Sequence, residues 1–96
     1  MGKFMPGRRI SNWYYVYVLQ SLKDGEFYVG YTIDLQARIA KHNAQKNKST
    51  KSRIPLQLIY AEACLAEEDA RRRECYLKTT QGRRMLKLRL RKFLNS

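Results

Sequence analysis

The side chains best suited to take part in a chemical reaction are two tyrosines, one arginine, the only histidine of the chain and one isolated carboxylate. They are Tyr17, Tyr28, Arg38, His42 and Glu74. Groups of these types could support metal-assisted hydrolysis of a phosphodiester. In that reaction a base or a metal-bound water attacks, an arginine steadies the phosphate charge, and a metal supports the transition state. Each residue also has an ordinary structural interpretation, and the elements that carry these residues decide between the two.

Both tyrosines lie in a predicted β-hairpin. Two runs of aromatic and β-branched residues, over 13–20 and 26–31, flank a segment that ends in Asp24-Gly25. Strand-forming residues around such a turn are the main short-range signal for a hairpin. Both faces of the first run are apolar, which is typical of a central strand covered on both sides.

The hairpin loop decides which residues of its two strands are paired. A loop over 20–25 pairs Tyr17 with Tyr28 and Tyr15 with Gly30, because side chains alternate between the two faces of a strand. Two phenols would then stand side by side, next to a glycine that leaves room for a ligand or a neighbouring backbone. The alternative is that these aromatic residues belong to the hydrophobic core.

Arg38 and His42 lie on the helix that should follow the hairpin. Thr32 or Asp34 is expected to cap this helix, which then extends to about residue 44–46. Residues four apart project from the same helix face, so the guanidinium and the imidazole should lie one turn apart.

Glu74 is the carboxylate for which the sequence offers no obvious structural role. It is expected mid-helix, on the side that faces the sheet, where an uncompensated charge is costly. One interpretation is a salt bridge to an arginine within 71–73 or to Lys78, or simple surface exposure. The other is a ligand for hydrated Mg²⁺, which commonly uses one or two protein carboxylates.

The remaining pattern completes one α+β domain over residues 13–96. Further along the chain we expect a strand over 56–64 after Pro55, a helix over 66–78, a break at Gln81-Gly82 and a helix over 83–94. The order β-β-α-β-α-α predicts a small three-stranded antiparallel sheet flanked by helices. Residues 1–12 are expected to form a flexible basic N-terminal arm.

The charge distribution points to a polyanionic partner. Twenty lysines and arginines against eight acidic residues give a net charge of +12. Between Asp34 and Glu62 there are six basic residues and no acidic one, and after Glu74 there are seven basic residues and no acidic one. A folded basic surface of this kind suits a nucleic-acid backbone. A basic protein with no such partner, a membrane-surface protein and a ribosomal protein are the alternatives.

The cysteines and the hydropathy argue for a cytoplasmic protein. Cys64 and Cys75 lack the spacing of a zinc site and are expected to be reduced, buried thiols. The sequence has no apolar segment of signal-peptide or membrane-spanning length. We therefore expect a cytoplasmic, nucleoid-associated protein that makes no membrane contact.

These residues together resemble the GIY-YIG nuclease domain. Its two name motifs correspond to Tyr15-Val16-Tyr17 and Tyr28-Val29-Gly30. The family's arginine, histidine and glutamate match Arg38, His42 and Glu74 in order and spacing. The resemblance covers about residues 13–78, and the rest of the chain is similar to small stand-alone bacterial members.

The resemblance implies a role for each residue at the reacting phosphate. Tyr17 would be the general base or would orient the attacking water, and Tyr28 would position that water and the phosphate. Arg38 would stabilise the phosphate, and His42 would assist proton transfer or polarise Tyr17. A free tyrosine has a pKa near 10, so unaided base catalysis by it at neutral pH is difficult.

The resemblance also implies a metal and a nucleic-acid surface. Glu74 would be the sole protein ligand of Mg²⁺ or Mn²⁺, and Gly30 would allow close packing beside the site. Four basic residues are expected to bind nucleic acid: Lys41, Lys51, Arg53 and Lys78.

Two departures from the family pattern matter for the function. Tyr15 and Val16 replace the glycine and isoleucine of the first motif, and the helical asparagine of larger members has no counterpart. The first hypothesis is a divalent-metal-dependent endonuclease acting on DNA in repair, recombination or defence. The second is a catalytically weak or inactive nucleic-acid-binding module, and the third is a subunit whose protein partner supplies specificity.

Overall fold

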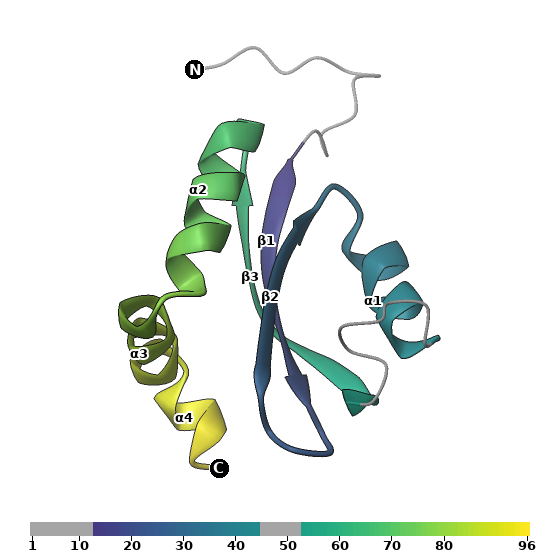
Figure 1. Ribbon diagram of the computed structural model, residues 1–96, viewed down its shortest axis with the longest axis vertical. Helices are drawn as coiled ribbons and strands as arrows, with labels where there is room; N and C mark the ends of the chain where they lie inside the picture. The colour runs from purple at the N-terminus through teal and green to yellow at the C-terminus, as the bar shows by residue number, and fades with distance from the viewer. Residues whose placement is uncertain (1–12, 45–52) are drawn as a thin grey trace.

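Three antiparallel strands in the order β2-β1-β3 form the sheet. The computed structural model describes residues 13–44 and 53–96 (Figure 1). The strands are β1 (Tyr14–Ser21), β2 (Phe27–Thr32) and β3 (Leu56–Cys64). The helices are α1 (Leu35–Asn43), α2 (Glu67–Leu77), α3 (Thr80–Arg89) and α4 (Arg91–Leu94). The α+β class and the element order are confirmed; the expected arm over 1–12 lies outside the described residues.

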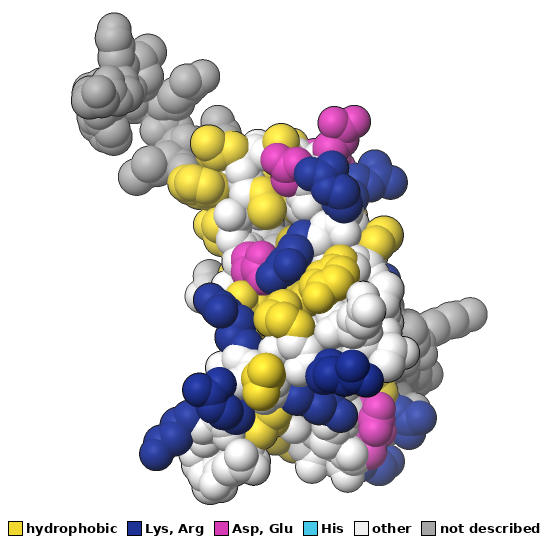
Figure 2. Space-filling view, turned by 90° about the vertical axis from the view of Figure 1, so that its left-hand side faces the viewer, with side chains coloured by type: hydrophobic (Ala, Val, Ile, Leu, Met, Phe, Trp, Pro, Cys, Tyr) yellow, Lys and Arg dark blue, Asp and Glu magenta, His cyan; other side chains and the backbone are white. Residues whose placement is uncertain are grey.

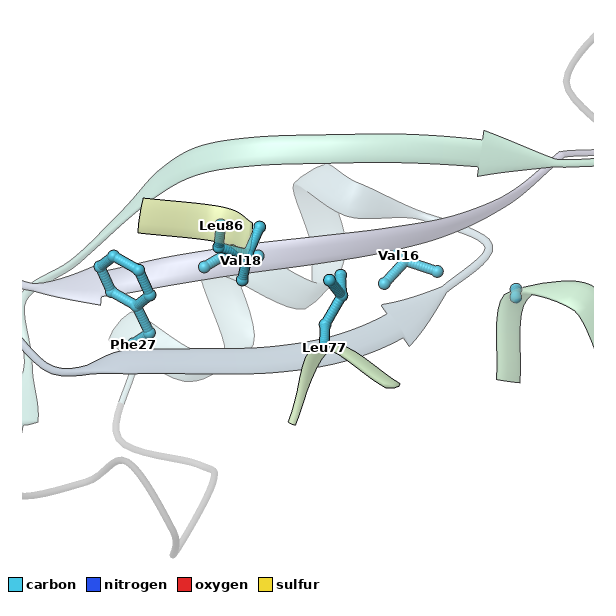
Figure 3. Close-up of a cluster of buried hydrophobic side chains, with 6 residues drawn as sticks. Val16, Val18, Phe27, Leu77 and Leu86 are labelled. Carbon is cyan, nitrogen blue, oxygen red and sulfur yellow. The ribbon is translucent and has the colours of Figure 1, made fainter. Parts of the chain in front are cut away.

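The central strand β1 is buried on both faces, as its sequence predicted. Val16 and Val18 are fully buried against α2 and α3, where Figure 3 shows them facing Leu77 and Leu86. The other face of β1 carries Tyr17 and Leu19 against α1 and the start of β3. Burying a valine or leucine side chain contributes about 1.5–3 kcal/mol, so β1 holds the two layers of helices together.

The predicted pairing of the hairpin is wrong by two residues. Tyr17 pairs with Gly30, and Tyr28 pairs with Leu19. The strand β1 continues to Ser21, whose backbone N–H donates to Glu26 O at 3.0 Å and whose carbonyl accepts from Gly25 N at 2.8 Å. The loop therefore lies later than expected. A shift of two residues keeps every side chain on its predicted face.

The predicted break at Gln81-Gly82 is also wrong. Thr79 caps α3, because its Oγ1 accepts from Gly82 N at 3.0 Å, so Gly82 lies in the first helical turn. A Cβ on Gly82 would lie 2.7 Å from Leu77 Cα, so this glycine allows α3 to start directly against the end of α2. The expected single helix over 83–94 is instead divided at Leu90 into α3 and α4.

The two cysteines are free, but the prediction that both are buried is wrong. Cys64 is half-buried at the end of β3, and Cys75 is exposed on α2. Within the described ranges, no helix has the length and apolar character needed to cross a membrane.

Candidate active site

A groove of about 810 Å³ follows β2, the edge strand next to β1. Consecutive residues of β2 line it, so both faces of this strand contribute to its walls. Helix α1 lies on one side of the sheet, and α2 with α3 lies on the other (Figure 1). Seven residues singled out in the sequence line this groove: Tyr17, Tyr28, Gly30, Arg38, His42, Glu74 and Lys78.

The phenol of Tyr17 and the imidazole of His42 form a buried pair at this groove. Tyr17 Oη lies 3.3 Å from His42 Nε2, and the two rings meet edge to face at 69°. Tyr17 comes from β1 and His42 from the last turn of α1. Gly30 stands opposite Tyr17 on β2, and a Cβ there would lie 2.6 Å from Tyr17 Cζ. The phenol therefore occupies the space that a side chain at position 30 would fill.

Burial shifts the pKa values of the two partners in opposite directions. Burial raises the pKa of Tyr17 above 10; nearby Arg38 opposes this shift, and Glu74 adds to it. Burial also lowers the pKa of His42 below 6.5, helped by the positive charges of Arg38 and Lys41. Both groups are therefore neutral near pH 7, with a phenol that holds its proton and an imidazole able to accept one.

Helix α1 presents Arg38 and His42 on one face, as their spacing predicted. Asp34 is the N-cap, and its Oδ1 accepts from Ala37 N at 3.1 Å. The apolar side of α1, including Leu35, packs over the face of β1 that carries Tyr17. Arg38 is half-buried and lines the groove, so its charge is held beside the Tyr17 phenol.

Glu74 reaches the groove from α2, on the opposite side of the sheet. It lies on the same face of α2 as Ala70, one turn before it, and Leu77, one turn after it, and both of these residues are fully buried. The Glu74 side chain is 18% exposed, and its Oε2 lies 3.0 Å from Lys78 Nζ. The salt bridge to Lys78 that the sequence allowed is therefore present, and the carboxylate still faces the groove.

Glu62 provides a useful contrast with Glu74. Its two oxygens share the Arg73 Nε–H, and Oε2 also accepts from Arg73 Nη2 and, at 2.8 Å, from Tyr60 Oη. Burial alone would raise the pKa of Glu62, but the hydrogen bonds from Arg73 and Tyr60 together with the Arg73 charge outweigh it and lower that pKa. Both oxygens of Glu62 are thus committed to structural bonds. Glu74 lines the groove and is paired with one flexible lysine, so its carboxylate can still bind a ligand there. Glu26 and Glu67 also line the groove, and Glu67 Oε2 accepts from Tyr31 Oη at 3.1 Å.

The donor set at Glu74 fits a hydrated Mg²⁺ or Mn²⁺ better than a caged metal. Among the described residues, no group of three or more histidine, cysteine or acidic side chains could enclose an ion. Mg²⁺ keeps several waters and uses one or two carboxylates together with substrate phosphate. The partly exposed Glu74 side chain in an open groove satisfies that requirement.

The expected nucleic-acid-binding residues are divided between the groove and its surroundings. Lys78 lines the groove, and Lys41 is exposed on α1. Arg53 contacts the Tyr28 phenol, whereas Lys51 lies outside the described residues. Sequence reasoning placed Arg83 only in a basic run, but it lines the groove from α3 and donates to Phe27 O at 3.4 Å. Figure 2 shows lysine and arginine side chains distributed over the α2–α4 side of the molecule.

The three-stranded sheet with its flanking helices, together with the tyrosine, arginine, histidine and glutamate side chains on the groove, places this chain in a class of nucleases. The family model described as the GIY-YIG catalytic domain matches residues 13–88, and the chain belongs to this nuclease family. Nucleases of this class act on nucleic acids, in keeping with the basic surface beside the groove.

The chain is similar to several small bacterial proteins named UPF0213. It is 43% identical over 76 residues to one from Staphylococcus haemolyticus, covering 78% of this chain and 92% of that protein. It is 45% identical over 65 residues to one from Streptococcus pneumoniae, covering 67% and 65%. A UPF0213 protein from Bacillus halodurans, solved by solution NMR, is 38% identical with a TM-score of 0.48, covering 77% of this chain and 81% of that one.

Proposed function

We propose that this protein is a divalent-metal-dependent endonuclease that hydrolyses phosphodiester bonds in DNA, with a role in repair, recombination or defence. The proposal depends above all on one observation. The Tyr17–His42 pair and Glu74 come from opposite sides of the sheet and line the same groove over β2. The site combines a proton relay with a carboxylate that can bind a metal ion, and basic side chains line the groove beside them.

The neutral Tyr17–His42 pair suits a relay better than a preformed tyrosinate. The raised pKa of Tyr17 keeps its phenol protonated, and the lowered pKa of His42 keeps its imidazole neutral. In the Nδ1–H tautomer, Nε2 accepts from the phenol. As the attacking water bonds to phosphorus, its proton passes to Tyr17 Oη while the phenol's own proton passes to His42 Nε2. The ester P–O bond breaks, and the leaving oxygen takes a proton from water.

Cationic side chains on the groove would hold the phosphate. Arg38 is half-buried beside Tyr17, where an oriented guanidinium stabilises developing charge more strongly than it would in water. The Tyr28 phenol, on the same groove, would position the phosphate or the attacking water. Lys78 and Arg83 line the α2–α3 side and would contact neighbouring phosphates.

Glu74 would hold the metal ion, with water completing the coordination. When bound, Mg²⁺ or Mn²⁺ would supply positive charge that stabilises the transition state and the leaving oxygen. The 18% exposure of Glu74 leaves room for a hydrated ion, and the charge of Lys78 offsets the carboxylate when no metal is present.

Cleavage of a panel of DNAs tests this function. Supercoiled, branched and single-stranded DNAs are incubated with Mg²⁺, Mn²⁺ or EDTA, using the wild-type protein, Glu74→Gln and the control Glu68→Gln. Glu68 is exposed in the first turn of the same helix and does not line the groove. We expect metal-dependent cutting that Glu74→Gln abolishes and Glu68→Gln retains.

Binding data separate the alternative function from the proposed one. Under either, log K should fall with log salt by about 0.9 for each phosphate neutralised on duplex DNA. Salt-dependent binding without cutting in any metal would support a non-catalytic nucleic-acid-binding module. Equal cutting by wild type and Glu74→Gln would show that Glu74 is not the metal ligand.

A further inference from the structure

Arg53 is tied to the hairpin turn on both its backbone and its side chain. The buried Ser21 donates from Oγ to Arg53 O at 2.6 Å. The next hairpin residue, Leu22, donates its N–H to Pro55 O at 2.9 Å. Arg53 Nε lies 3.1 Å from Asp24 Oδ2. The start of the segment leading into β3 is therefore fixed against the β1–β2 turn.

The same guanidinium contacts a phenol of the candidate active site. Arg53 Nε donates to Tyr28 Oη at 3.0 Å. This bond occupies the oxygen of the phenol as an acceptor, so the phenol's own proton is left to be donated elsewhere. Tyr28 lines the groove, whereas Arg53 is not among the residues that line it. The phenol thus connects Arg53 to the space where a phosphate would lie.

We propose that Arg53 is a positioning residue that acts through Tyr28, with Asp24 holding the guanidinium in place. The inference rests on the proposed nuclease function. It differs from the expectation that Arg53 binds the nucleic-acid backbone directly. Arg53 fixes the Tyr28 oxygen and orients the phenol O–H toward the reacting phosphate or its attacking water. Its removal therefore affects the rate of the chemical step more than the affinity for DNA.

The hydrogen bond between Arg53 and Tyr28 also links the hairpin turn to the candidate site on β2. Ser21 Oγ accepts from Lys23 N at 3.0 Å and from Asp24 N at 3.2 Å while donating to the Arg53 carbonyl. The turn that orients the Asp24 carboxylate is thus the one that holds Arg53. A chain of polar contacts runs from the turn through the guanidinium to the phenol.

A double-mutant cycle tests this role. Maximal single-turnover cleavage rates and half-saturating protein concentrations are measured with excess protein for wild type, Arg53→Ala, Tyr28→Phe and the double variant. A misplaced catalytic group can cost about a hundredfold in rate, so we expect Arg53→Ala to lower the maximal rate about ten- to a hundredfold. In the Tyr28→Phe background the same change should cost about twofold or less, because contacting residues do not act independently.

Two further variants separate positioning from charge. Arg53→Lys keeps the positive charge but loses the planar guanidinium, so it should retain affinity and not restore the rate. Arg72→Ala removes one positive charge from an exposed position that pairs with Asp69, and it should leave the maximal rate unchanged. With tyrosine labelled with ¹³C at Cζ, the Tyr28 resonance should move in Arg53→Ala even without substrate.

The outcomes distinguish this inference from the proposed function. If Arg53→Ala and Tyr28→Phe lower the rate multiplicatively, Arg53 does not act through Tyr28 and only this inference is overturned. A Tyr28 resonance that does not move in Arg53→Ala, or full recovery of the rate by Arg53→Lys, overturns it as well. A wild-type protein that cuts no DNA under any metal condition overturns both proposals.

Discussion

Replacing Gly30 by alanine should reduce cleavage far more than it reduces stability. Gly30 pairs with Tyr17 across the β1–β2 ladder, and the Tyr17 ring covers the place where a Cβ would lie. In Gly30→Ala that Cβ would be 2.6 Å from Tyr17 Cζ and 3.1 Å from Cε2. Carbon atoms in contact prefer about 3.5–4.0 Å, so the ring must move by about 1 Å.

The cost of this movement falls on the site more than on the fold. The clash involves the far end of a side chain that can rotate, so the overpacking cost should lie near the lower end of about 1–3 kcal/mol. Alanine in a strand also regains about 0.5–1 kcal/mol relative to glycine. The Tyr17 hydroxyl, however, must leave its position 3.3 Å from His42 Nε2. A displacement of about 1 Å can cost a hundredfold in rate, or about 2.7 kcal/mol in the activation barrier.

Cleavage rates and urea unfolding of Gly30→Ala and Tyr17→Phe provide the assay. Tyr17→Phe removes the hydroxyl and leaves the ring in place, so both variants should cut about a hundredfold more slowly than wild type or worse. Gly30→Ala should lose no more than about 1–2 kcal/mol of unfolding free energy. A folded Gly30→Ala that cuts within about threefold of the wild-type rate would refute the argument that Gly30 places the phenol.

Three other predictions concern pH, the metal ligand and the α2–α3 junction. Burial lowers the pKa of His42 in the folded protein. Its imidazole is therefore protonated near pH 6.5 in the unfolded chain but only at lower pH in the folded protein. The free energy of unfolding should therefore fall as pH drops through that interval, and His42→Gln should weaken this dependence in urea titrations at pH 5.5 and 7.5. Lys78→Met should tighten Mn²⁺ binding severalfold, measured by electron paramagnetic resonance without DNA, because Lys78 Nζ lies 3.0 Å from Glu74 Oε2; an unchanged Kd would contradict this. Gly82→Ala should cost about 1–3 kcal/mol or more in thermal unfolding, because its Cβ would meet the backbone at Leu77 Cα, which cannot rotate away.

The sequence predicted the elements and the shared faces better than the contacts. Alternation along β1 and β2 placed Tyr17, Tyr28 and Gly30 on one face. That placement is correct although the predicted pairing was wrong by two residues, because side chains in a strand repeat every two residues. The loop position depended on Ser21, whose side chain satisfies the N–H groups of Lys23 and Asp24 in the turn. Composition does not distinguish a serine that extends a strand from one that begins a loop.

Contacts between distant segments could not be obtained from local patterns. Gly82 was expected to lie in a break between two helices, but its missing side chain allows the close approach of α3 to the end of α2. Arg53 was expected to bind phosphate, and nothing in its neighbours indicated a bond to Tyr28, 25 positions earlier. For Glu74 the sequence offered several cationic partners, and only the three-dimensional arrangement selects Lys78.

The opposite pKa shifts of Tyr17 and His42 limit how this site can work. If the pair existed as tyrosinate and imidazolium before substrate arrived, burial would have to favour two charges, whereas it disfavours both. For the proposed reaction we therefore expect the proton to move from Tyr17 to His42 only when the attacking water loses its own proton. Arg38 lowers the pKa of both partners, which weakens the imidazole as a base while making the phenol easier to deprotonate. Removing the Arg38 charge should thus raise the pKa of His42 and move the acidic limb of the pH–rate profile to higher pH, and it should also lower the maximal rate. Loss of phosphate binding alone would lower the rate without moving that limb.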